Sequence, residues 1–528
     1  MPYGWAITPL SMLGELRLGK MLDKTKNHGD TVQYLRNVNV RWFEFDIADL
    51  KDIRVSDKER DLLSVQDGDL FICEGGEPGR CAVWRAGANS LVYQKALHRF
   101  RTNGAIAPEF LMYRLRHDIE ANVLQSAFTG TTIKHLTRER LAKHLVPLPA
   151  IAEQIRIAAQ LDKLLARIQT CNDRIDAIPA LLKRFRQAVL TAATSGALTE
   201  DWRAQRETRV ARMEPSAESG NFVRDSGQRS YQVTPTPDSA SLHPGYVAQS
   251  KQQLTPDAVM AARRCVVGHT EKRSVIDFLA NHHPKRADKN LPDSWLIAHV
   301  GTVGIVSNGS TPSRKENSFW NGDIPWVSSG EVANGVISRT KERITDAGFR
   351  NSSVRLLPKG TVLVAMIGEG KTRGQSALLL IDACINQNIA AVVPFAEIVQ
   401  SEYLWFWFQS QYENTRTKGN GSGPKALNCE RVRELEVYLP PLAEQSEIIR
   451  RVEALFKLAD RIESRYKAAR TQAQRLTPLL LAKAFRGELV PQDPNDEPAS
   501  VLLERIDALR SELMARKICS DHKLHCSQ

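Results

Sequence analysis

The chain has 528 residues, of which 42% are hydrophobic, so it can bury more than one core and a single compact domain is not expected. Its 72 lysines and arginines outnumber its 60 aspartates and glutamates, and the net charge of +12 favours a polyanionic partner or an acidic protein surface. No apolar run approaches the roughly 18 to 20 residues of a membrane span, and the first residues lack the layout of a signal peptide. We therefore expect a cytoplasmic protein that does not bind a membrane.

Residues 1–147 mix short apolar runs with glycine-rich turns. The run Leu70-Phe71-Ile72 is typical of a strand, and the stretch from Phe110 to Leu115 is typical of a helix. This mixture predicts a first α+β domain that presents loops from one face.

Residues 148–200 predict a long helix. The segment begins with Leu-Pro-Ala-Ile-Ala-Glu-Gln and then places apolar residues at alternating steps of three and four, which is the spacing of a coiled-coil seam. The seam positions are Leu161, Leu164, Ile168, Ile175, Leu182 and Phe185. Because Pro179 removes a backbone donor inside this stretch, we expect the helix to kink or break there into two helices in line.

Residues 201–290 are polar and lack clear periodicity. They include Ser216-Ala217-Glu218-Ser219-Gly220 and Thr234-Pro235-Thr236-Pro237. This composition predicts a long linker that is disordered in part, with room for one small helix.

The second half of the chain repeats the first. Residues 291–438 again mix apolar runs, such as Thr361-Val362-Leu363-Val364, with turns and a helical stretch from Tyr403 to Phe408. Residues 439–492 begin with Leu-Pro-Pro-Leu-Ala-Glu-Gln and match residues 148–199 at one fixed offset without a gap. The second seam has Ile448, Val452, Leu455, Ile462, Leu476 and Leu480. Pro478 lies within this stretch and is expected to disturb the second helix as Pro179 disturbs the first. A helical tail, 493–528, follows.

Two seams of this length in one chain predict an intramolecular antiparallel coiled coil. The fold class is therefore two similar α+β domains separated by two long helices that pair with each other. Some 35 residues of helix span roughly 50 Å at about 1.5 Å per residue, which exceeds one turn of B-DNA at about 34 Å. Such helices could set the spacing between two DNA-contacting domains.

The order and duplication of these segments resemble the specificity subunits of type I restriction-modification enzymes. The resemblance rests on the paired Leu-Pro-x-[Ile/Leu]-Ala-Glu-Gln segments, on the helix ends near Ser195-Gly196-Ala197-Leu198 and Arg486-Gly487-Glu488-Leu489, and on the tail from Asp496 to Ile506. It covers nearly the whole chain except the linker.

The resemblance implies a non-catalytic subunit whose two target recognition domains each read half of an interrupted double-stranded DNA site. It also implies that the helices bind modification (methyltransferase) subunits, two of them, and that a restriction subunit for translocation and cleavage completes the complex. S-adenosylmethionine, ATP and Mg would then belong to those partners, with no cofactor in this chain.

Candidate DNA contacts follow from chemistry, because phosphates are bound by Lys and Arg while a few polar side chains read base edges. Three loops per domain combine glycines with such residues at matching positions. The first domain offers Lys20, Lys24, Arg80, Thr131, Thr132 and Lys134, and the second offers Ser310, Thr311, Arg314, Lys315, Lys371, Arg373, Ser422 and Lys425.

Two other functions stay open. One is a scaffold in which two sugar-, RNA- or peptide-binding domains sit on a coiled coil without DNA specificity. The other is an enzyme that uses the loop Gly370-Lys371-Thr372, either as a relaxed phosphate-binding loop or, through Glu369, Lys371 and Asp346, as a nuclease site. The eight cysteines form no zinc-binding pattern, and we expect reduced thiols and no metal site.

Overall fold

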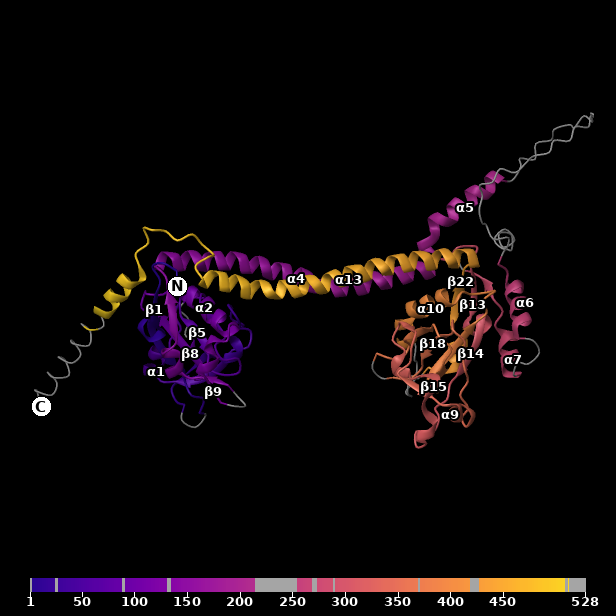
Figure 1. Cartoon of the computed structure of the whole chain (residues 1–528), viewed down its shortest axis with the longest axis horizontal. Coiled ribbons are helices and arrows are strands. Elements are labelled where there is room, and N and C mark those ends of the chain that lie inside the picture. Colours follow the sequence, from indigo (N-terminus) through magenta and orange to yellow (C-terminus); the bar gives the residue numbers. More distant parts are fainter. Residues whose placement is uncertain are drawn as a thin grey trace, which may run out of the picture. The chain divides into compact units, whose positions relative to one another are not determined.

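The computed structural model divides into two compact units. It describes residues 2–23, 27–87, 91–130, 134–213, 254–267, 273–287, 290–368, 371–417, 427–508 and 511. The first unit comprises Met1–Ile178 and Arg465–Gln528, and the second comprises Pro179–Ser464. Each unit therefore contains one mixed α/β domain together with part of each of the two long helices (Figure 1).

The domain of the first unit has two main sheets and two separate strand pairs. The larger sheet has the antiparallel order β2 (Gly14–Leu18), β8 (Leu97–Thr102), β5 (Leu70–Cys73), β6 (Cys81–Val83). The smaller has the order β4 (Lys51–Val55), β3 (Asp30–Leu35), β7 (Val92–Tyr93). The two-stranded sheets are β1 (Ala6–Pro9) with β11 (Leu145–Leu148) and β9 (Phe128–Thr129) with β10 (His135–Leu136). Its helices are α1 (Asp57–Leu62), α2 (Pro108–Glu120) and α3 (Arg138–Ala142), with 3-10 turns at Leu10–Met12, Asn37–Asn39 and Val123–Ala127.

The domain of the second unit repeats the two main sheets and the β1–β11 pair, with one added strand in each of two sheets, whereas the residues that correspond to β9–β10 lie mostly outside those described. Its larger sheet has the order β14 (Gly304–Asn308), β21 (Ile389–Pro394), β18 (Val362–Ala365), β19 (Ser376–Leu379), β16 (Val336–Ile337). The smaller has the order β17 (Glu342–Ile344), β15 (Trp320–Val327), β20 (Cys384–Ile385), and a third contains β12 (Lys285–Arg286), β13 (Leu296–His299) and β22 (Glu436–Leu439). Its helices are α8 (Val300–Val303), α9 (Asp346–Arg350), α10 (Ser401–Ser410), α11 (Tyr412–Thr417) and α12 (Cys429–Arg433), with 3-10 turns at Asn317–Phe319 and Ser329–Glu331. The prediction of two similar α+β domains is confirmed.

The central strand of each larger sheet is buried on both faces, which explains its unbroken apolar sequence. In β5, Leu70 and Ile72 belong to one core, and Phe71 and Cys73 belong to another. In β18, Val362 and Val364 likewise face one core while Leu363 and Ala365 face the other. Helices α2 and α10 cover the same face in the two domains, because they contribute Phe110 and Leu111, and Tyr403 and Leu404, to the first of these cores.

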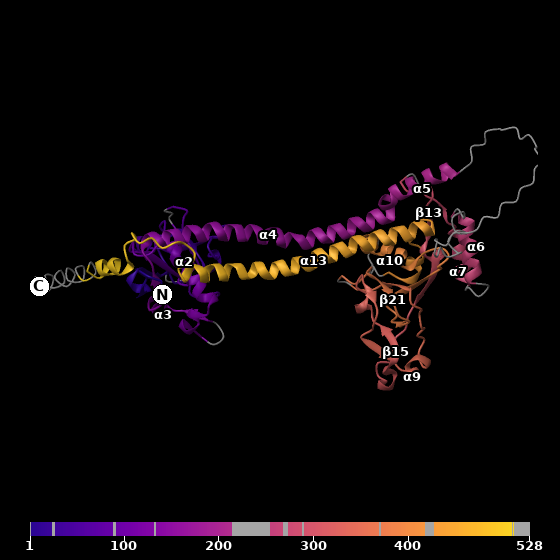
Figure 2. The same cartoon turned by 45° about the horizontal axis from the view of Figure 1, so that its top comes forward.

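The two long helices are α4 (Ile151–Ser195) and α13 (Leu442–Phe485), and they lie side by side in Figures 1 and 2. In the first unit the start of α4 packs against the end of α13, through Ile157 and Leu161 with Leu481, Ala484 and Phe485. In the second unit the end of α4 packs against the start of α13, through Val189, Leu190 and Ala193 with Ile448 and Val452. The helices therefore run antiparallel, as predicted.

Neither proline divides its helix, so the expectation of two helices in line was wrong. Pro179 and Pro478 lie inside α4 and α13 and are both exposed. A proline removes one helical hydrogen bond, but on the solvent face water can donate a hydrogen bond to the carbonyl that is left without its partner. Asp176 pairs with Arg470 at 3.5 Å and Arg186 pairs with Asp460 at 2.7 Å, so ion pairs to the opposite helix flank the turn that contains Pro179.

Two of the predicted seam residues lie outside the seam. Leu161, Leu182, Ile448 and Val452 are buried, and Leu164, Ile168, Ile175, Phe185, Leu455 and Leu480 are partly buried. Ile462 and Leu476 are instead 39% and 45% exposed, and Ala459, Tyr466 and Ala473 are buried on this part of α13. Val452, Ala459, Tyr466 and Ala473 recur every seven residues and are all buried, so the contact face of α13 follows this row. Ile462 and Leu476 each lie three residues after a member of the row, at the edge of the contact face.

The predicted linker contains more regular structure than its composition suggests. It includes the helices α5 (Glu200–Met213), α6 (Pro256–Val267) and α7 (Arg273–Asn281), followed by β12. Helix α6 packs on the second domain because Val259 is buried in its core, while the guanidinium of Arg263 donates to the Gly301 carbonyl at 2.7 Å and lies over the ring of Phe395. The remainder of the linker, 214–253, 268–272 and 288–289, lies outside the described residues.

Candidate nucleic-acid interface

Loops from three parts of the first domain meet around Asn37. The guanidinium of Arg80 donates to the carbonyl oxygen of Asn37 at 2.9 Å, and the side-chain amide of Gln94 donates to Asn37 Oδ1 at 3.3 Å. Gly76 also lies here, since a Cβ atom on it would be 3.1 Å from Asn37 Nδ2. The turn between β5 and β6 and the turn between β7 and β8 are therefore neighbours at one end of the domain.

Lys20 belongs to the same end, but its charge is already paired. Its amide donates to the Tyr93 carbonyl at 2.8 Å, and its largely buried side chain forms an ion pair with Glu59. The hydrogen bond from Lys20 is the largest of the effects that lower the pKa of Glu59 to about 2. Lys20 therefore holds its own loop in place, and its ammonium group is less available to bind a phosphate.

Arg80 is also engaged within the protein. Besides Asn37, it contacts Glu77 at 2.9 Å, and only a small part of its side chain is exposed. Two of the predicted phosphate ligands of the first domain thus have carboxylate partners that neutralise them. Both residues position loops of this end of the domain.

The hairpin of β9 and β10 lies against the turn between β5 and β6. The Leu136 amide donates to the Glu74 carbonyl at 2.8 Å, and a Cβ atom on Gly75 would be 3.2 Å from His135 Nδ1. Lys134 in this hairpin is exposed, with its ammonium 6.0 Å from the centre of the Phe128 ring. Two predicted loops are thereby brought together, although Thr131, Thr132 and Lys24 lie outside the described residues.

The second domain uses the same close approach at its first loop. A Cβ atom on Gly309 would be 1.9 Å from the Ile385 carbonyl oxygen, and one on Gly19 would be 2.2 Å from that of Tyr93. Only glycine fits at either position, which explains why the two repeats share it. The Ser310 amide then donates to the Ile385 carbonyl at 3.0 Å, and the Thr311 hydroxyl donates to Gln387.

Arg314 is held on two tryptophans. Its guanidinium lies 3.8 Å from the ring centre of Trp320 and 5.1 Å from that of Trp326, and it forms an ion pair with Glu342 that lowers the pKa of this carboxyl. The two indoles also donate to the backbone of the same loop, Trp320 to Ser313 O and Trp326 to Ser310 O, both at 3.1 Å. Arg314 therefore stiffens the loop, and the adjoining Lys315 is exposed.

The turn between β18 and β19 carries Lys371 and Arg373. The Tyr412 hydroxyl donates to the Lys371 carbonyl at 2.7 Å, and a Cβ atom on Gly374 would be 2.6 Å from the Thr415 hydroxyl. Arg373 and Arg416 donate to each other's carbonyl oxygens at 3.4 Å. Helix α11 is thus fastened to this turn, whereas Ser422 and Lys425 lie outside the described residues.

The same turn is not a phosphate-binding loop. Such a loop leads from a strand into a helix whose N-terminus faces the phosphates, but the residues after Thr372 lead into strand β19. Glu369 and Gly370, which the two enzymatic alternatives require, lie outside the described residues. In the part of the chain that the structure describes, no three His, Cys, Asp or Glu residues gather as a metal site.

Sequence patterns missed Lys95 and Gln387. Both are exposed in equivalent turns, between β7 and β8 and between β20 and β21, directly after the buried residues Gln94 and Asn386. The Lys95 amide donates to the Lys20 carbonyl at 2.8 Å, so this turn lies beside the first predicted loop. Gly19 contacts β7 and Gly309 contacts β20, and a comparison of the residues that follow these two strands would have identified Lys95 and Gln387.

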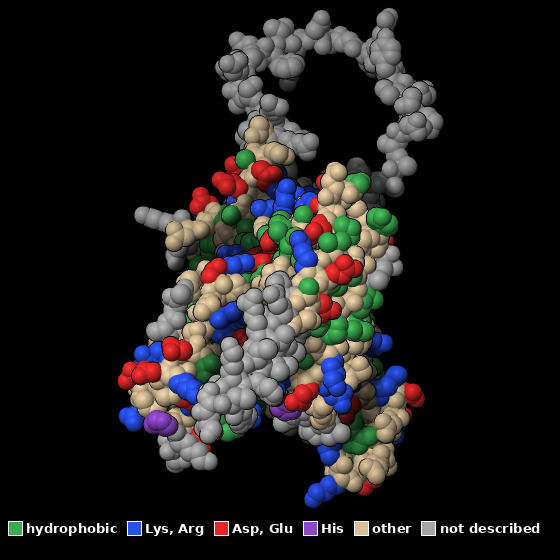
Figure 3. Space-filling model, turned by 90° about the vertical axis from the view of Figure 1, so that its left-hand side faces the viewer, with side chains coloured by type: hydrophobic (Ala, Val, Ile, Leu, Met, Phe, Trp, Pro, Cys, Tyr) green, Lys and Arg blue, Asp and Glu red, His purple; other side chains and the backbone are tan. Residues whose placement is uncertain are grey.

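Figure 3 shows Lys and Arg side chains interspersed with carboxylates on the face that it presents, without one continuous basic patch. This agrees with the ion pairs of Lys20 and Arg80 in the first unit. On that face the net positive charge does not form one basic region, and the exposed lysines named above are the candidates for phosphate contacts.

Each repeated Ala-Glu-Gln segment joins a long helix to its domain in the same way. Trp5 Nε1 donates to Glu153 at 3.2 Å, and Trp295 Nε1 donates to Glu444 at 3.0 Å. The next residue in each segment, Gln154 or Gln445, accepts from a backbone amide just before α2 or α10 at 2.8 Å. The repeated Ala-Glu-Gln motif therefore attaches each long helix to its domain.

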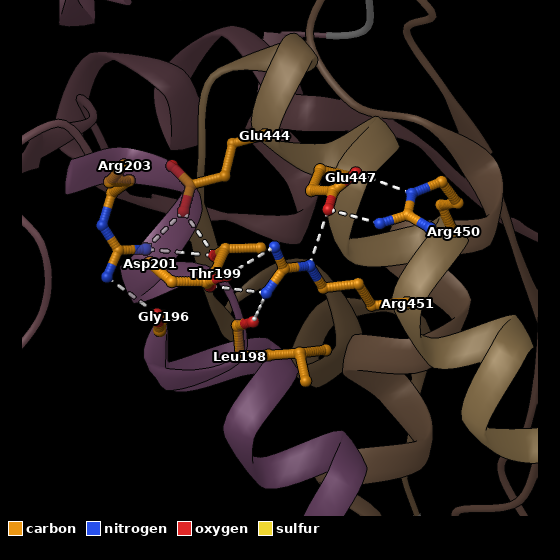
Figure 4. A network of polar contacts seen from close by, with 9 residues as sticks. All are labelled: Gly196, Leu198, Thr199, Asp201, Arg203, Glu444, Glu447, Arg450 and Arg451. Atoms are coloured by element: carbon orange, nitrogen blue, oxygen red, sulfur yellow. Dashed lines mark hydrogen bonds and ion pairs between the residues drawn. The ribbon is translucent and has the colours of Figure 1, made fainter. Parts of the chain in front are cut away.

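The end of the other long helix completes each joint. Gly196 and Gly487 have φ values of +84° and +74°, and Cβ atoms on them would lie 2.5 Å from Pro292 Cγ and 2.6 Å from Pro2 Cγ. In the second unit, Glu444 also accepts from Thr199 at 2.7 Å and from Arg203 (Figure 4).

A second cluster of ion pairs lies beside this joint. Arg451 contacts Asp201 at 2.6 Å and Glu447 at 2.6 Å, and its guanidinium donates to the Leu198 carbonyl at 2.8 Å (Figure 4). The hydrogen bond from Arg450 is the largest effect that lowers the pKa of Glu447 to about 2. In the first unit, an ion pair between Arg156 and Asp496 connects the start of α4 to the residues after α13.

Comparison with known proteins gives one consistent result. A family model described as "Type I restriction modification DNA specificity domain" matches residues 3–180 and again residues 292–469. The chain is 25% identical to the StySPI specificity subunit of Salmonella potsdam over 97% of its own length and 96% of the relative's. It is 26% identical to the EcoKI specificity subunit of Escherichia coli K12, over 98% of both chains.

Solved structures share the fold. A chain from a study of complex assembly and conformational transition of the type I R-M system has a TM-score of 0.59 at 17% identity, covering 92% of this chain and 99% of that one. The HsdS subunit from Thermoanaerobacter tengcongensis has a TM-score of 0.54 at 17% identity, covering 92% and 98%. Within the described residues, no helix is long and apolar enough to span a membrane.

Proposed function

The chain belongs to the family of type I restriction modification DNA specificity domains, two copies of which it contains, and we propose that it reads an interrupted, two-part target in double-stranded DNA. The observation that carries this proposal is the duplicated domain. Both copies share one topology and the same glycine contact at the first loop, yet they differ in the exposed side chains of that end. One fold with two sets of loop residues is what two different half-sites require.

The exposed residues at this end of each domain are the proposed DNA contacts. They are Lys95 and Lys134 in the first domain and Lys315, Lys371 and Gln387 in the second. The half-buried Ser310 and Thr311 are proposed with them, as are Lys24, Thr131, Thr132, Ser422 and Lys425, which lie outside the described residues. Lys20, Arg80 and Arg314 instead hold loops in position through Glu59, Glu77 and Glu342. In this proposal the exposed residues provide affinity for phosphate, whereas Lys20, Arg80 and Arg314 hold the loops so that other side chains reach base edges.

The paired helices are the proposed spacer and assembly surface. Large apolar side chains stay exposed on them, namely Leu181, Leu458 and Ile462 in the second unit and Leu476 and Leu479 in the first. Exposed leucines and isoleucines on a helix pair are suited to docking further helices. We assign this surface to two modification subunits, and a restriction subunit would join the assembled complex.

The chain itself is proposed to be non-catalytic. Adenine methylation would use S-adenosylmethionine on the modification subunits, and DNA cleavage would use ATP and Mg on the restriction subunit. The repeated loops support this division, because the residues assigned to them are lysines, amides and hydroxyls suited to binding DNA.

Genome-wide mapping of methylated adenine tests the proposal. The full chain is expressed with its modification subunits in cells that lack other adenine methylation, and the motif is compared with those of two variants. Lys95→Ala with Lys134→Ala should relax or lose one half of an interrupted motif, and Lys315→Ala with Lys371→Ala should affect the other half.

The control is Lys457→Ala, an exposed lysine on α13 outside both domains, which should leave the motif unchanged. A continuous motif, or equal effects of both variants on both halves, would contradict the proposal. Absence of any methylation with a correctly assembled complex would favour a scaffold that lacks DNA specificity.

A further inference from the structure

Exposed basic residues follow strand β17 and helix α9 of the second domain. β17 is the outer strand of its sheet, with β15 on one side, and in the described part of the chain no strand lies on its other side. Four basic residues of this segment are exposed, and we call them the β17 basic patch: Arg339, Lys341, Arg343 and Arg350. Figure 1 shows α9 at the end of the second domain that lies away from the start of α13.

Carboxylates do not neutralise the charges of this patch. In the described part of the chain no ion pair involves any of its four residues, and the guanidinium of Arg343 donates instead to the Asp323 carbonyl oxygen at 2.5 Å. Residues 339–350 contain two carboxylates, of which Glu342 is already paired with Arg314, which leaves Asp346. The segment therefore keeps a net positive charge.

The equivalent segment of the first domain has balanced charges. It comprises residues 50–61, in which β4 pairs with β3 as β17 pairs with β15, and each outer strand leads into a short helix, α1 or α9. These residues include four bases and four acids, and Arg60 is paired with Asp30 at 2.6 Å. Charged residues protect an outer strand from pairing with other chains, but β4 shows that this protection needs no excess of positive charge.

The β17 basic patch begins beside the loops that are proposed to contact DNA. β17 runs antiparallel to β15, so its start lies next to the end of β15, and the Lys341 amide donates to the Glu331 carboxylate at 2.9 Å in the turn that follows β15. The Asn386 amide donates to the Val327 carbonyl oxygen at 3.1 Å, which places the turn between β20 and β21 beside the same end. From Lys341 the patch leads along β17 to Arg350 at the end of α9, away from these loops.

We propose that the β17 basic patch binds phosphates of the DNA duplex that flanks the half-site of the second domain, independently of base sequence. This inference rests on the proposed function, because that function places DNA at the neighbouring loops. Exposed lysines and arginines without carboxylate partners attract a polyanion, and phosphate contacts supply affinity and position without reading bases. Because the charges of residues 50–61 are balanced, the DNA footprint extends further past the second half-site than past the first.

Binding titrations at several salt concentrations test the patch, with the full chain assembled with its modification subunits. A long target duplex carries about ten extra base pairs, one turn of B-DNA, beyond the half-site that depends on Lys315 and Lys371, and a trimmed duplex ends at that half-site. Lys341→Ala with Arg350→Ala should reduce the slope of log K against log salt by about 1.8 on the long duplex, since each phosphate contact contributes about 0.9. The slope on the trimmed duplex should equal that of the wild type, which also shows that the variant is folded, and the methylated motif should stay unchanged.

The matched control is Lys51→Ala with Lys58→Ala, which removes two exposed lysines from the equivalent segment of the first domain. It should leave the slope unchanged on a duplex with about ten extra base pairs beyond the first half-site, and a reduction as large as that of the patch variant would contradict the unequal footprint.

Three results with the patch variant would overturn the inference. One is an unchanged slope on the long duplex, and another is an equal reduction on the trimmed duplex, which would place the patch within the half-site. The third is weaker binding of the modification subunits, which would assign the patch to an acidic protein surface. A wild-type complex that binds no target duplex would overturn the proposed function as well, so the two failures are distinguishable.

Discussion

The indole Nε1 of Trp295 donates a hydrogen bond to Oε2 of Glu444 at 3.0 Å, although the two residues are 149 positions apart in the chain. The carboxylate is buried, and its other oxygen accepts from Thr199 and Arg203. Glu444 thus joins the start of the second domain, the end of α4 and the start of α13 within one unit. The equivalent hydrogen bond from Trp5 to Glu153 occurs in the first unit.

Replacement of Glu444 should be strongly destabilising. In Glu444→Ala, the buried donors of Trp295 and Thr199 and the charge of Arg203 lose their acceptor, and we expect the free energy of unfolding to fall by about 3 kcal/mol. Urea unfolding followed by tryptophan fluorescence measures this. Glu453→Ala, at an exposed position on the same helix, should unfold as the wild type does, and equal effects of the two variants would contradict the role given to Glu444.

The first unit should lose stability in acid through Asp118. Burial by itself would raise the pKa of this carboxyl, but hydrogen bonds from His117 and His144 and the charge of Arg114 outweigh it and hold the pKa well below 3.8. Since the folded-state pKa is depressed, the stabilisation is complete above the unfolded-state pKa and is lost as the pH falls through the folded-state value.

Asp118→Asn provides the measurement for this prediction. The difference in unfolding free energy between the wild type and Asp118→Asn should be constant from pH 5 to 7 and should shrink below about pH 4. Urea titrations at each pH supply the values. A difference that is the same at pH 3 and pH 6 would show that the ionised carboxylate of Asp118 does not stabilise the fold.

In the first domain, Lys95 and Arg80 should behave differently towards salt. Lys95 is exposed, so Lys95→Ala should reduce the slope of log K against log salt by about 0.9 if the lysine contacts one phosphate. Arg80 is paired with Glu77 and Asn37, so Arg80→Ala should leave this slope unchanged while lowering stability. Binding titrations with a target duplex at several salt concentrations decide between them, and a reversed pattern would restore Arg80 as the phosphate ligand.

In the second domain, Arg314 should control specificity and Lys315 should control affinity. Arg314→Ala removes the guanidinium from Trp320 and Glu342, which loosens the loop that starts at Gly309. Discrimination between the target and a duplex with one altered half-site should therefore decrease in Arg314→Ala, whereas Lys315→Ala should weaken binding to both duplexes alike. Arg314→Lys keeps the charge but not the planar stack and should resemble Arg314→Ala, so wild-type discrimination in Arg314→Lys would contradict the stacking role.

Two leucines test the helix pairing. Leu161 is fully buried against the end of α13, so Leu161→Asp should cost about 3 kcal/mol or more, because a carboxylate is costly to bury. Leu476→Asp, at a residue that is half-exposed, should cost far less. Thermal or urea unfolding of both variants gives the comparison, and a similar loss in each would mean that Leu476 belongs to the seam after all.

Short-range patterns in the sequence predicted the elements that depend on burial alone. The run Leu70-Phe71-Ile72 became β5 because both of its faces are buried, and the steps of three and four placed the buried residues Leu161 and Val452 correctly. The proline rule failed because it describes an isolated helix, whereas pairing with a second helix outweighs one lost hydrogen bond.

The loop residues were harder to assign because their partners are distant in the sequence. Lys20 is paired with Glu59, which is 39 residues away, and Arg314 with Glu342, which is 28 residues away. A basic residue in a glycine-rich loop has the same local signal whether it faces DNA or a carboxylate of its own domain. The repeat itself gave the better guide, since it aligned Gly19 with Gly309, where a close backbone contact permits no other residue.

The composition of the first unit has a consequence for synthesis. Its core contains Phe110 and Leu161, and it also contains Leu481, Phe485, Ala499 and Ile506 from the far end of the chain. A ribosome delivers residues 1–178 long before the residues that complete their core, and in the interval it makes every residue of the second unit. The domain that is translated first is therefore the one that finishes folding last, and a ribosome that stalls before residue 465 would leave it with an open core.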